Sequence, residues 1–324
     1  MRIIDIHTHG IGGYDTRTTR IDHILKIAKI QGSHGVSEIL LTIYPTSIEI
    51  MRENLETVRK AMEKQRNNPI YPVTSRLQSL PRKNSPFPPL EKGGKGEFDK
   101  KERGRVNKPA KIIGMHLEGP FLNPSKCGAL DRRSLILPTE QNFEKLIEGF
   151  KDVVKIITVA PEMKGALRLI RKIAGRGIIV SMGHSDATYA EAEAGFHAGA
   201  RGITHVFNAM RGFHHREPGI AEFGLLNPDI FIEVIADPYH LHPKTLELIF
   251  KVKDPRKIII VSDTVKKTKT SGRSKKGIFD TSGRLLGGSM TITESARRLI
   301  ELGHAKNVIL KCITENPRMY LNGG

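Results

Sequence analysis

Residues 112–121 read IIGMHLEGPF, a short apolar run that ends in a glutamate, a glycine and a proline. An apolar run of this length, bounded by turn-forming residues, is typical of a strand buried on both faces. Glu118 ends the run, and Pro120 and Phe121 follow closely. Burying the charge of the Glu118 carboxylate costs free energy unless a partner or a metal ion neutralises it. The stretch therefore predicts a buried strand over 112–118 that ends in a chemically important carboxylate.

Similar apolar runs recur along the chain and alternate with amphipathic helical patterns. The other runs lie at residues 3–7, 36–42, 156–160, 178–184, 203–206, 230–236 and 257–263. The helical patterns lie at 21–30, 49–62, 140–150, 165–174, 189–198, within 219–226 and at 291–302. Strands that alternate with helices pair in parallel through right-handed crossovers, and eight such units close a barrel. We therefore predict an α/β protein, a single (β/α)8 TIM barrel over residues 1–324.

Residues 74–108 interrupt this alternation between the second helix and the third strand. They are rich in proline, glycine and charge, with ten Lys or Arg against four Asp or Glu. Such a segment cannot bury enough apolar surface to offset the entropy of ordering it. We predict a disordered surface insertion, with a basic docking loop as the functional alternative.

Composition sets the broad class of the protein. The formal net charge is +18, but the basic residues are widely spread and aromatic residues make up 6% of the chain. With no nucleic-acid-binding module, this favours a solvated basic surface over binding to RNA or DNA. No apolar run approaches the roughly 20 residues that span a bilayer. The N-terminus lacks the pattern of a secretory signal, and two cysteines without a CxxC motif suit the cytoplasm.

Polar residues with metal-binding chemistry fall at the ends of the predicted strands. In a barrel, the carboxyl ends of the strands meet on one face, where active sites are found. Imidazole and carboxylate ligands together suit Zn²⁺ or a similar divalent ion. Taken singly, each residue has an ordinary explanation, such as a hydrogen-bonded core histidine. Together they predict a metal-dependent hydrolase, with the candidate residues His7, His9, Glu118, His184, His205 and Asp263.

A resemblance to a known family covers most of the chain. It is carried, in order, by DIHTHG, GMHLEGPFLNP, SMGHSDAT, THVFNAM, HREPG, IADPYHLHP, VSDT and LLGGSMT. These runs resemble those of the N-acetylglucosamine-6-phosphate deacetylases, in the amidohydrolase superfamily. The likeness extends from Asp5 to about Pro317 and leaves out only the insertion.

The resemblance implies an activity and a metal site. The reaction would be hydrolysis of the acetamide of N-acetylglucosamine 6-phosphate, giving glucosamine 6-phosphate and acetate. Glu118, His184 and His205 would hold the principal metal ion. His7 and His9 would hold a second ion with Glu118 bridging, and Asp263 would be the general base and acid. Zinc is the first choice of metal, as one or two ions, with iron, manganese and cobalt as alternatives.

The same resemblance implies a substrate site and an assembly. Asn208, the backbone at Ala209, His240 and Ala129 would contact the amino sugar phosphate. Arg216 would reach the phosphate bound by a neighbouring subunit, which makes the protein a homodimer. On the residues alone, Arg216 could instead pair with Glu217, Asn208 could be a turn residue and His240 a loop residue.

The sequence departs from the family pattern at three places. Leu130 stands where the family has a histidine that polarises the substrate carbonyl, and leucine donates no hydrogen bond. The small β-sandwich that family members assemble from both chain ends is not recognisable here. The loop after Asp263 contains Lys266 and Lys267 where the family usually has small residues.

These departures leave two alternatives open. The first is a deacetylase of a related N-acyl amino sugar phosphate, such as N-acetylgalactosamine 6-phosphate. The second is a decayed, weakly active paralogue that binds a metal ion or a sugar phosphate. The presence of Asp263 argues against the second alternative, because a pure binder has no need of a general base.

Overall fold

Eight parallel strands form the centre of the molecule, and they neighbour one another in chain order. The computed structural model describes residues 2–67, 108–270 and 276–323, so the predicted insertion lies outside the described residues except for Lys108. The strands are β1 (Ile4–Thr8), β4 (Glu38–Ile43), β5 (Lys111–Leu117), β6 (Val154–Val159), β7 (Ile179–Met182), β8 (Gly202–Ile203), β9 (Phe231–Ile235) and β10 (Ile258–Val261).

The last strand returns to the first and nearly closes the sheet. Thr8 and Thr264 form a parallel bridge across this seam. On either side of it, the Asp263 amide donates to the His7 carbonyl at 2.9 Å, and the His9 amide donates to the Thr264 carbonyl at 2.8 Å. The predicted TIM barrel is confirmed.

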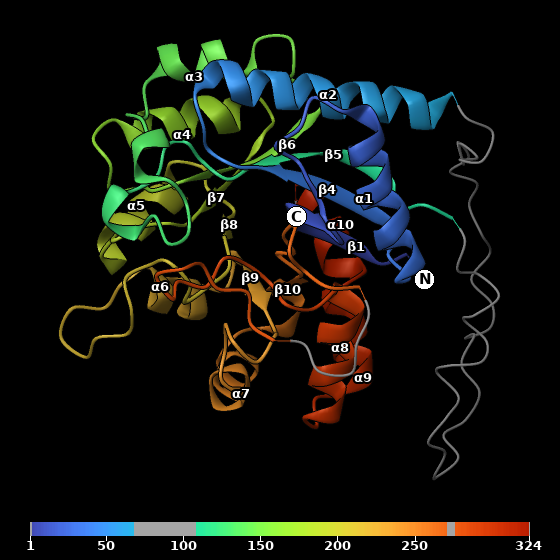
Figure 1. The fold of residues 1–324 in the computed structure, drawn as a ribbon. Helices are drawn as coiled ribbons and strands as arrows, with labels where there is room; N and C mark the ends of the chain where they lie inside the picture. Colours follow the sequence, from blue (N-terminus) through green and yellow to red (C-terminus); the bar gives the residue numbers. More distant parts are fainter. Residues whose placement is uncertain (1, 68–107, 271–275, 324) are drawn as a thin grey trace, which may run out of the picture.

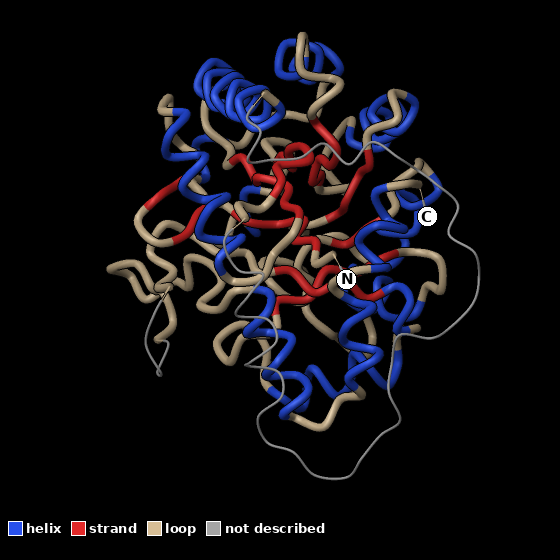
Figure 2. Tube along the Cα trace, turned by 90° about the vertical axis from the view of Figure 1, so that its right-hand side faces the viewer, coloured by secondary structure: helices blue, strands red, loops and turns tan. Residues whose placement is uncertain are grey.

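Helices surround the strands, as Figures 1 and 2 show. They are α1 (Ile21–Ser33), α2 (Ile48–Arg66), α3 (Glu140–Ile147), α4 (Ala166–Gly175), α5 (Tyr189–His197), α6 (Ile220–Leu226), α7 (Pro243–Val252), α8 (Ile292–Glu301), α9 (Lys306–Cys312) and α10 (Glu315–Leu321). Helix α8 illustrates the local reasons: Thr291 and Glu294 form a capping box at its start, and Ile292, Ala296 and Leu299 are buried at helical spacing. None of the described helices is both long and apolar enough to cross a bilayer.

The structure corrects the prediction for the sixth strand and adds elements that the sequence did not indicate. The sixth strand is present, but β8 contains only Gly202 and Ile203, so the bounds predicted for it, 203–206, are wrong. The extended backbone ends there because His205 and Phe207 have positive φ angles, 31° and 74°. The unpredicted elements are the hairpin β2 (Gly10–Ile11) and β3 (Tyr14–Asp15), helices α7, α9 and α10, and the 3₁₀ turns Pro124–Lys126, Arg132–Ser134 and Pro255–Lys257.

Helix α10 closes the amino end of the barrel. Its Tyr320 is 2% exposed and belongs to an apolar cluster with residues of β1, β9 and β10. The Tyr320 and Phe231 rings lie 5.1 Å apart. Asn316 anchors the helix, because its side-chain amide donates to the Pro255 and Ile258 carbonyls at 2.7 Å each. Helix α10 therefore acts as a plug at the end opposite the carboxyl ends of the strands.

We predict that Tyr320→Ala lowers the free energy of unfolding by about 3–5 kcal/mol, as expected when a buried aromatic ring is replaced by a cavity. Tyr320→Phe keeps the ring and should change it by less than about 1.5 kcal/mol. Urea denaturation followed by circular dichroism measures both. Equal losses for the two variants would contradict the idea that ring packing is the stabilising contribution.

Candidate functional site

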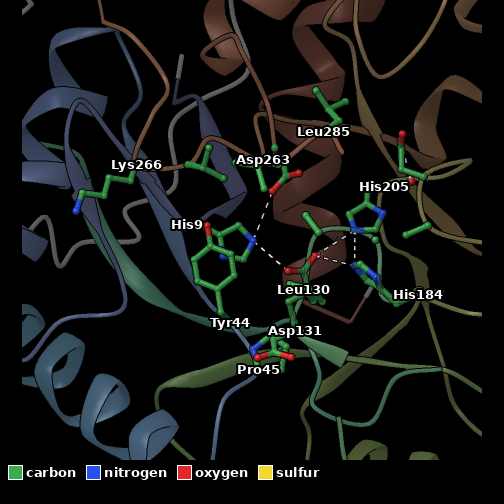
Figure 3. A pocket seen from close by; sticks show the side chains of 18 of the residues that line it. His9, Tyr44, Pro45, Leu130, Asp131, His184, His205, Asp263, Lys266 and Leu285 are labelled. Carbon is green, nitrogen blue, oxygen red and sulfur yellow. Dashed lines mark hydrogen bonds and ion pairs between the residues drawn. The ribbon is translucent and has the colours of Figure 1, made fainter. Parts of the chain in front are cut away.

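The six residues predicted from the sequence meet at the carboxyl end of the barrel, with Glu118 at the centre. Figure 3 shows four of them, His9, His184, His205 and Asp263, around the cavity. The Nε2 atoms of His184 and His205 each lie 3.1 Å from Glu118 Oε1. The two nitrogens are also 3.1 Å from each other. These three side chains therefore surround one point in space, although they come from three different strand ends.

A second group lies on the other side of the same carboxylate. His9 Nε2 is 3.1 Å from Glu118 Oε2, and His7 Nε2 is 3.5 Å from Glu118 Oε1. Both histidine nitrogens are 3.5 Å from Asp263 Oδ1. Glu118 is thus shared between the two groups.

The hydrogen bonds of the outward-facing ring nitrogens determine whether the inward-facing nitrogens carry a proton or a lone pair. His184 Nδ1 lies 2.9 Å from the Lys126 carbonyl oxygen, which can only accept a hydrogen bond, so Nδ1 carries the proton. His7 Nδ1 lies 3.0 Å from Glu233 Oε2 and donates to it in the same way. In the neutral rings, the lone pairs on Nε2 then face Glu118. His7 Nε2 is buried without a hydrogen-bond partner.

Lone pairs gathered around a carboxylate require positive charge between them, from protons or from a metal ion. Within the described residues, Glu118 with His184 and His205 forms one group that could hold an ion, and His7 with His9 and Asp263 forms another. Tetrahedral ligands about 2.1 Å from one ion lie about 3.4 Å from each other, close to the measured 3.1 Å. The donor set therefore fits a divalent ion.

The same arrangement explains the electrostatics of the ligands. Burial opposes charge on His7, but the neighbouring carboxylates of Glu118 and Glu233 raise its pKa well above the usual value. Burial also opposes ionisation of Glu118, but the surrounding histidines, His9 first, hold its pKa well below the usual value. A proton on His7 and a metal ion therefore compete for the same place beside Glu118.

Three residues of the site were not predicted from the sequence. Glu233, on β9, is 1% exposed and accepts the hydrogen bond of His7 Nδ1. His116 Nε2 lies 2.8 Å from the Thr158 hydroxyl, and burial lowers the pKa of His116 to about 3, so its ring is neutral. The Tyr44 ring stacks on His9 with the centres 3.8 Å apart. Strand alternation from Glu118 would have indicated His116, and a single carboxylate in the apolar run FIEVI would have indicated Glu233, whereas nothing in the sequence indicated Tyr44.

Several site residues have a backbone conformation that L-residues rarely adopt. The φ angles of His184, His205 and Asp263 are 47°, 31° and 47°. Such residues cost on the order of 1–3 kcal/mol each and persist where the surrounding structure enforces them. Each lies two residues after the end of a strand, and the left-handed residue ends the extended backbone where its side chain joins the cluster.

A cavity of about 480 Å³ opens above the cluster. Four predicted substrate-contacting residues line it, namely Asn208, Ala209, His240 and Ala129. His240 is held by Asp237, whose Oδ1 lies 3.0 Å from His240 Nδ1. Leu130, 9% exposed, also lines the cavity.

Arg216 lies away from this cavity. It is exposed, and its backbone amide donates to His214 Nδ1 at 3.4 Å. The ion pair of Arg216 with Glu217 that the sequence alone allowed does not form, since Glu217 lies 3.9 Å from Arg211 instead.

Three relatives found by comparison with known proteins are all named as deacetylases of N-acetyl amino sugar 6-phosphates. No family model matches the chain. The chain is 28% identical over 310 residues to the N-acetylgalactosamine-6-phosphate deacetylase of Escherichia coli. The aligned region covers 92% of this chain and 71% of that protein. It is 34% identical over 202 residues to the N-acetylglucosamine-6-phosphate deacetylase of Bacillus subtilis, covering 62% of this chain and 49% of that protein. For the human enzyme of the same name the identity is 40% over 165 residues, covering 48% of this chain and 40% of the enzyme.

Solved structures agree with these relatives. The N-acetylglucosamine-6-phosphate deacetylase of Thermotoga maritima superposes with a TM-score of 0.76 at 25% identity, over 99% of this chain and 78% of that one. The Pasteurella multocida enzyme of the same name gives a TM-score of 0.79 at 22% identity, over 99% and 76% of the two chains, and supports the fold. In sequence and in fold, the chain is therefore similar to N-acetylglucosamine-6-phosphate deacetylases and to their N-acetylgalactosamine-6-phosphate counterpart, and it spans about half the length of the Bacillus enzyme that it matches.

Proposed function

We propose that this protein is a metal-dependent amidohydrolase that converts N-acetylglucosamine 6-phosphate to glucosamine 6-phosphate and acetate. The observation that carries the proposal is that Glu118 contacts His184 and His205 as well as His7 and His9, with Asp263 beside them and a cavity above. The names of the Bacillus and human relatives support the substrate. The E. coli relative is named for N-acetylgalactosamine 6-phosphate, so that epimer is the alternative substrate.

The two groups of ligands have separate roles in this proposal. Glu118, His184 and His205 hold the principal ion, and His7 and His9 hold a second ion with Glu118 bridging. Zinc is proposed first, because tetrahedral histidine and carboxylate sites suit it, with iron, manganese or cobalt as alternatives. A bound divalent cation lowers the pKa of water towards neutrality and polarises a carbonyl oxygen, which an unreactive acetamide requires.

Asp263 is the proposed general base and acid. Its side chain is 12% exposed, so it faces the cavity while remaining within 3.5 Å of His7 and His9. From there it accepts a proton from the attacking water and then delivers a proton to the leaving nitrogen. The departing amine requires this second transfer, because an amide anion is a very poor leaving group.

The remaining proposed roles concern the substrate and its surroundings. Asn208, Ala209, Ala129 and His240 contact the amino sugar. Arg216 suits contact with a phosphate held by a second copy of the chain, since its planar guanidinium offers several donors, and this contact makes the protein a homodimer. The proposed location is the cytoplasm, where free cysteines such as those of this chain persist.

Glu233 is proposed as a positioning residue for the second ion. Its carboxylate accepts the Nδ1 proton of His7, and both side chains are almost fully buried. This bond fixes the tautomer and the ring orientation that present Nε2 to the metal position, and it makes the imidazole a stronger ligand.

The general-base role predicts a selective loss of turnover. Zinc-loaded protein should release acetate from N-acetylglucosamine 6-phosphate, and Asp263→Asn should lower kcat by about 10²–10⁴-fold. A coupled assay for acetate measures the rate, and metal analysis checks that the principal ion is retained. If the unaltered, metal-loaded protein released no acetate from either epimer, the proposed reaction would be wrong.

The positioning role of Glu233 predicts a change in metal content. Glu233→Ala should weaken binding of the second ion by about 10–100-fold, and Glu233→Gln, which keeps an acceptor without its charge, should have a smaller effect. Titration with zinc under competition from a chelator measures each affinity. Glu222→Gln is the matched control, because Glu222 is equally buried but caps α6 and lies outside the metal-binding groups. Unchanged affinity for both ions in Glu233→Ala would exclude the role.

The leucine at position 130 predicts a gain of activity on substitution. Leu130→His restores a donor towards the developing oxyanion, and kcat should rise by up to about 10²–10³-fold. Leu286→His, which places a histidine in another loop of the same cavity, is the control and should not raise kcat. No gain in Leu130→His would mean that the carbonyl does not meet residue 130 in this protein.

A further inference from the structure

Three cationic side chains line the same side of the cavity rim, and none of them has a role in the proposed reaction. They are Arg17, which follows the hairpin β2–β3, and Lys266 and Lys267, which follow Asp263. We call this set the cationic ledge. The two lysines occupy the loop in which the sequence departs from the small residues usual in the family.

Arg17 is oriented rather than freely mobile. Its Nε and Nη2 atoms lie 3.2 Å and 3.0 Å from the two carboxylate oxygens of Asp15, which is itself 8% exposed. The guanidinium carbon lies 4.2 Å from the centre of the Tyr44 ring. This side-on pairing uses two of the three guanidinium nitrogens, so the Nη1 donors remain available to a ligand.

The backbone fixes the lysines next to the hairpin. The Gly13 amide donates to the Lys266 carbonyl at 2.9 Å, and the Gly12 amide donates to the Thr268 carbonyl at 3.0 Å. The Thr268 hydroxyl donates to the Gly288 carbonyl at 2.7 Å. Across the described ranges of the chain, neither lysine ammonium has an acidic partner. Figure 3 shows Lys266 on the same side as His9 and Tyr44, with its amino group directed away from the cluster.

Arg17 of the ledge lies within reach of a substrate whose amide is at the metal-binding groups. Tyr44 is 3.8 Å from His9 and 4.2 Å from the guanidinium carbon of Arg17, so that carbon is within about 8 Å of the His9 ring. A sugar ring with one substituent bridges such a distance. Arg17 is paired with Asp15, whereas Lys266 and Lys267 have no acidic partner among the described residues; cations of like charge repel one another, and an anion bound between them would relieve this repulsion.

We infer that the cationic ledge binds an oxyanion carried by the substrate. This inference rests on the proposed function, which puts the amide of the substrate at the metal-binding groups. The oxyanion is either the phosphate of the amino sugar or a carboxylate at the end of a longer acyl group, and both accept charge-assisted hydrogen bonds from guanidinium and ammonium.

The test compares substrates with and without the anion. The variant Arg17→Ala/Lys266→Ala/Lys267→Ala is assayed, metal-loaded, on N-acetylglucosamine 6-phosphate, N-acetylglucosamine and N-succinylglucosamine. If the phosphate binds the ledge, KM for the phosphorylated substrate rises about 10–100-fold while kcat changes less than about twofold. KM for N-acetylglucosamine stays the same. If a carboxylate binds instead, the rise in KM appears with N-succinylglucosamine alone.

A matched control removes the same number of charges elsewhere. Arg20→Ala/Lys244→Ala/Lys251→Ala alters exposed residues that are paired with acids away from the cavity, and should leave every KM unchanged. Calorimetric titration with inorganic phosphate provides a measurement that needs no turnover, so failure of the proposed reaction and failure of the ledge remain distinguishable. Unchanged phosphate affinity in the ledge variant, together with unchanged KM for both anionic substrates, would overturn the inference.

Discussion

The site depends on one electrostatic constraint, the burial of the Glu118 carboxylate among imidazole nitrogens. Glu118 is 4% exposed, and its oxygens face four histidine Nε2 atoms at 3.1–3.5 Å. An isolated buried carboxylate would be unstable, and the neutral rings of His184 and His7, whose Nδ1 protons are donated outward, offer it lone pairs rather than protons. Positive charge must therefore lie within the cluster. The outer hydrogen bonds to Lys126 and Glu233 make a cation the natural source of that charge, because they direct the lone pairs of His184 and His7 inward.

The barrel satisfies this constraint by the way its strands end. Parallel strands bring residues as distant in sequence as His7 and Asp263 to one rim, and the bridge between Thr8 and Thr264 aligns them across the seam. The left-handed backbone at His184, His205 and Asp263 completes the arrangement. Its energetic cost is tolerated because the apolar core below, which α10 closes at the other end, fixes the positions of the strands.

The barrel and the six polar residues around Glu118 could be predicted from the sequence, because both follow from the periodic spacing of apolar runs. The apolar runs marked the strands, and the six polar residues at their ends were identified correctly as a cluster. Periodicity could not indicate the residues that act through others. Tyr44 belongs to the site only because its ring stacks on His9, and Glu233 stands within an apolar strand with no partner nearby in sequence. The length of β8 was also mispredicted, because the positive φ of His205 depends on tertiary contacts and not on local propensity.

The residues that line the cavity differ in polarity, and this difference bears on which substrates the cavity selects. Leu130 and Leu286 are apolar residues of the lining, whereas Arg17, Lys266 and Lys267 make part of the rim strongly basic. An apolar wall near the cluster disfavours a polar group on the substrate there, since that group would lose its hydrogen bonds to water. A basic rim favours negative charge further out. A substrate that suits both surfaces has its amide and short acyl group inside the cavity and its charge at the mouth. An N-acyl amino sugar phosphate has this distribution of polarity, and a neutral amide of the same size does not.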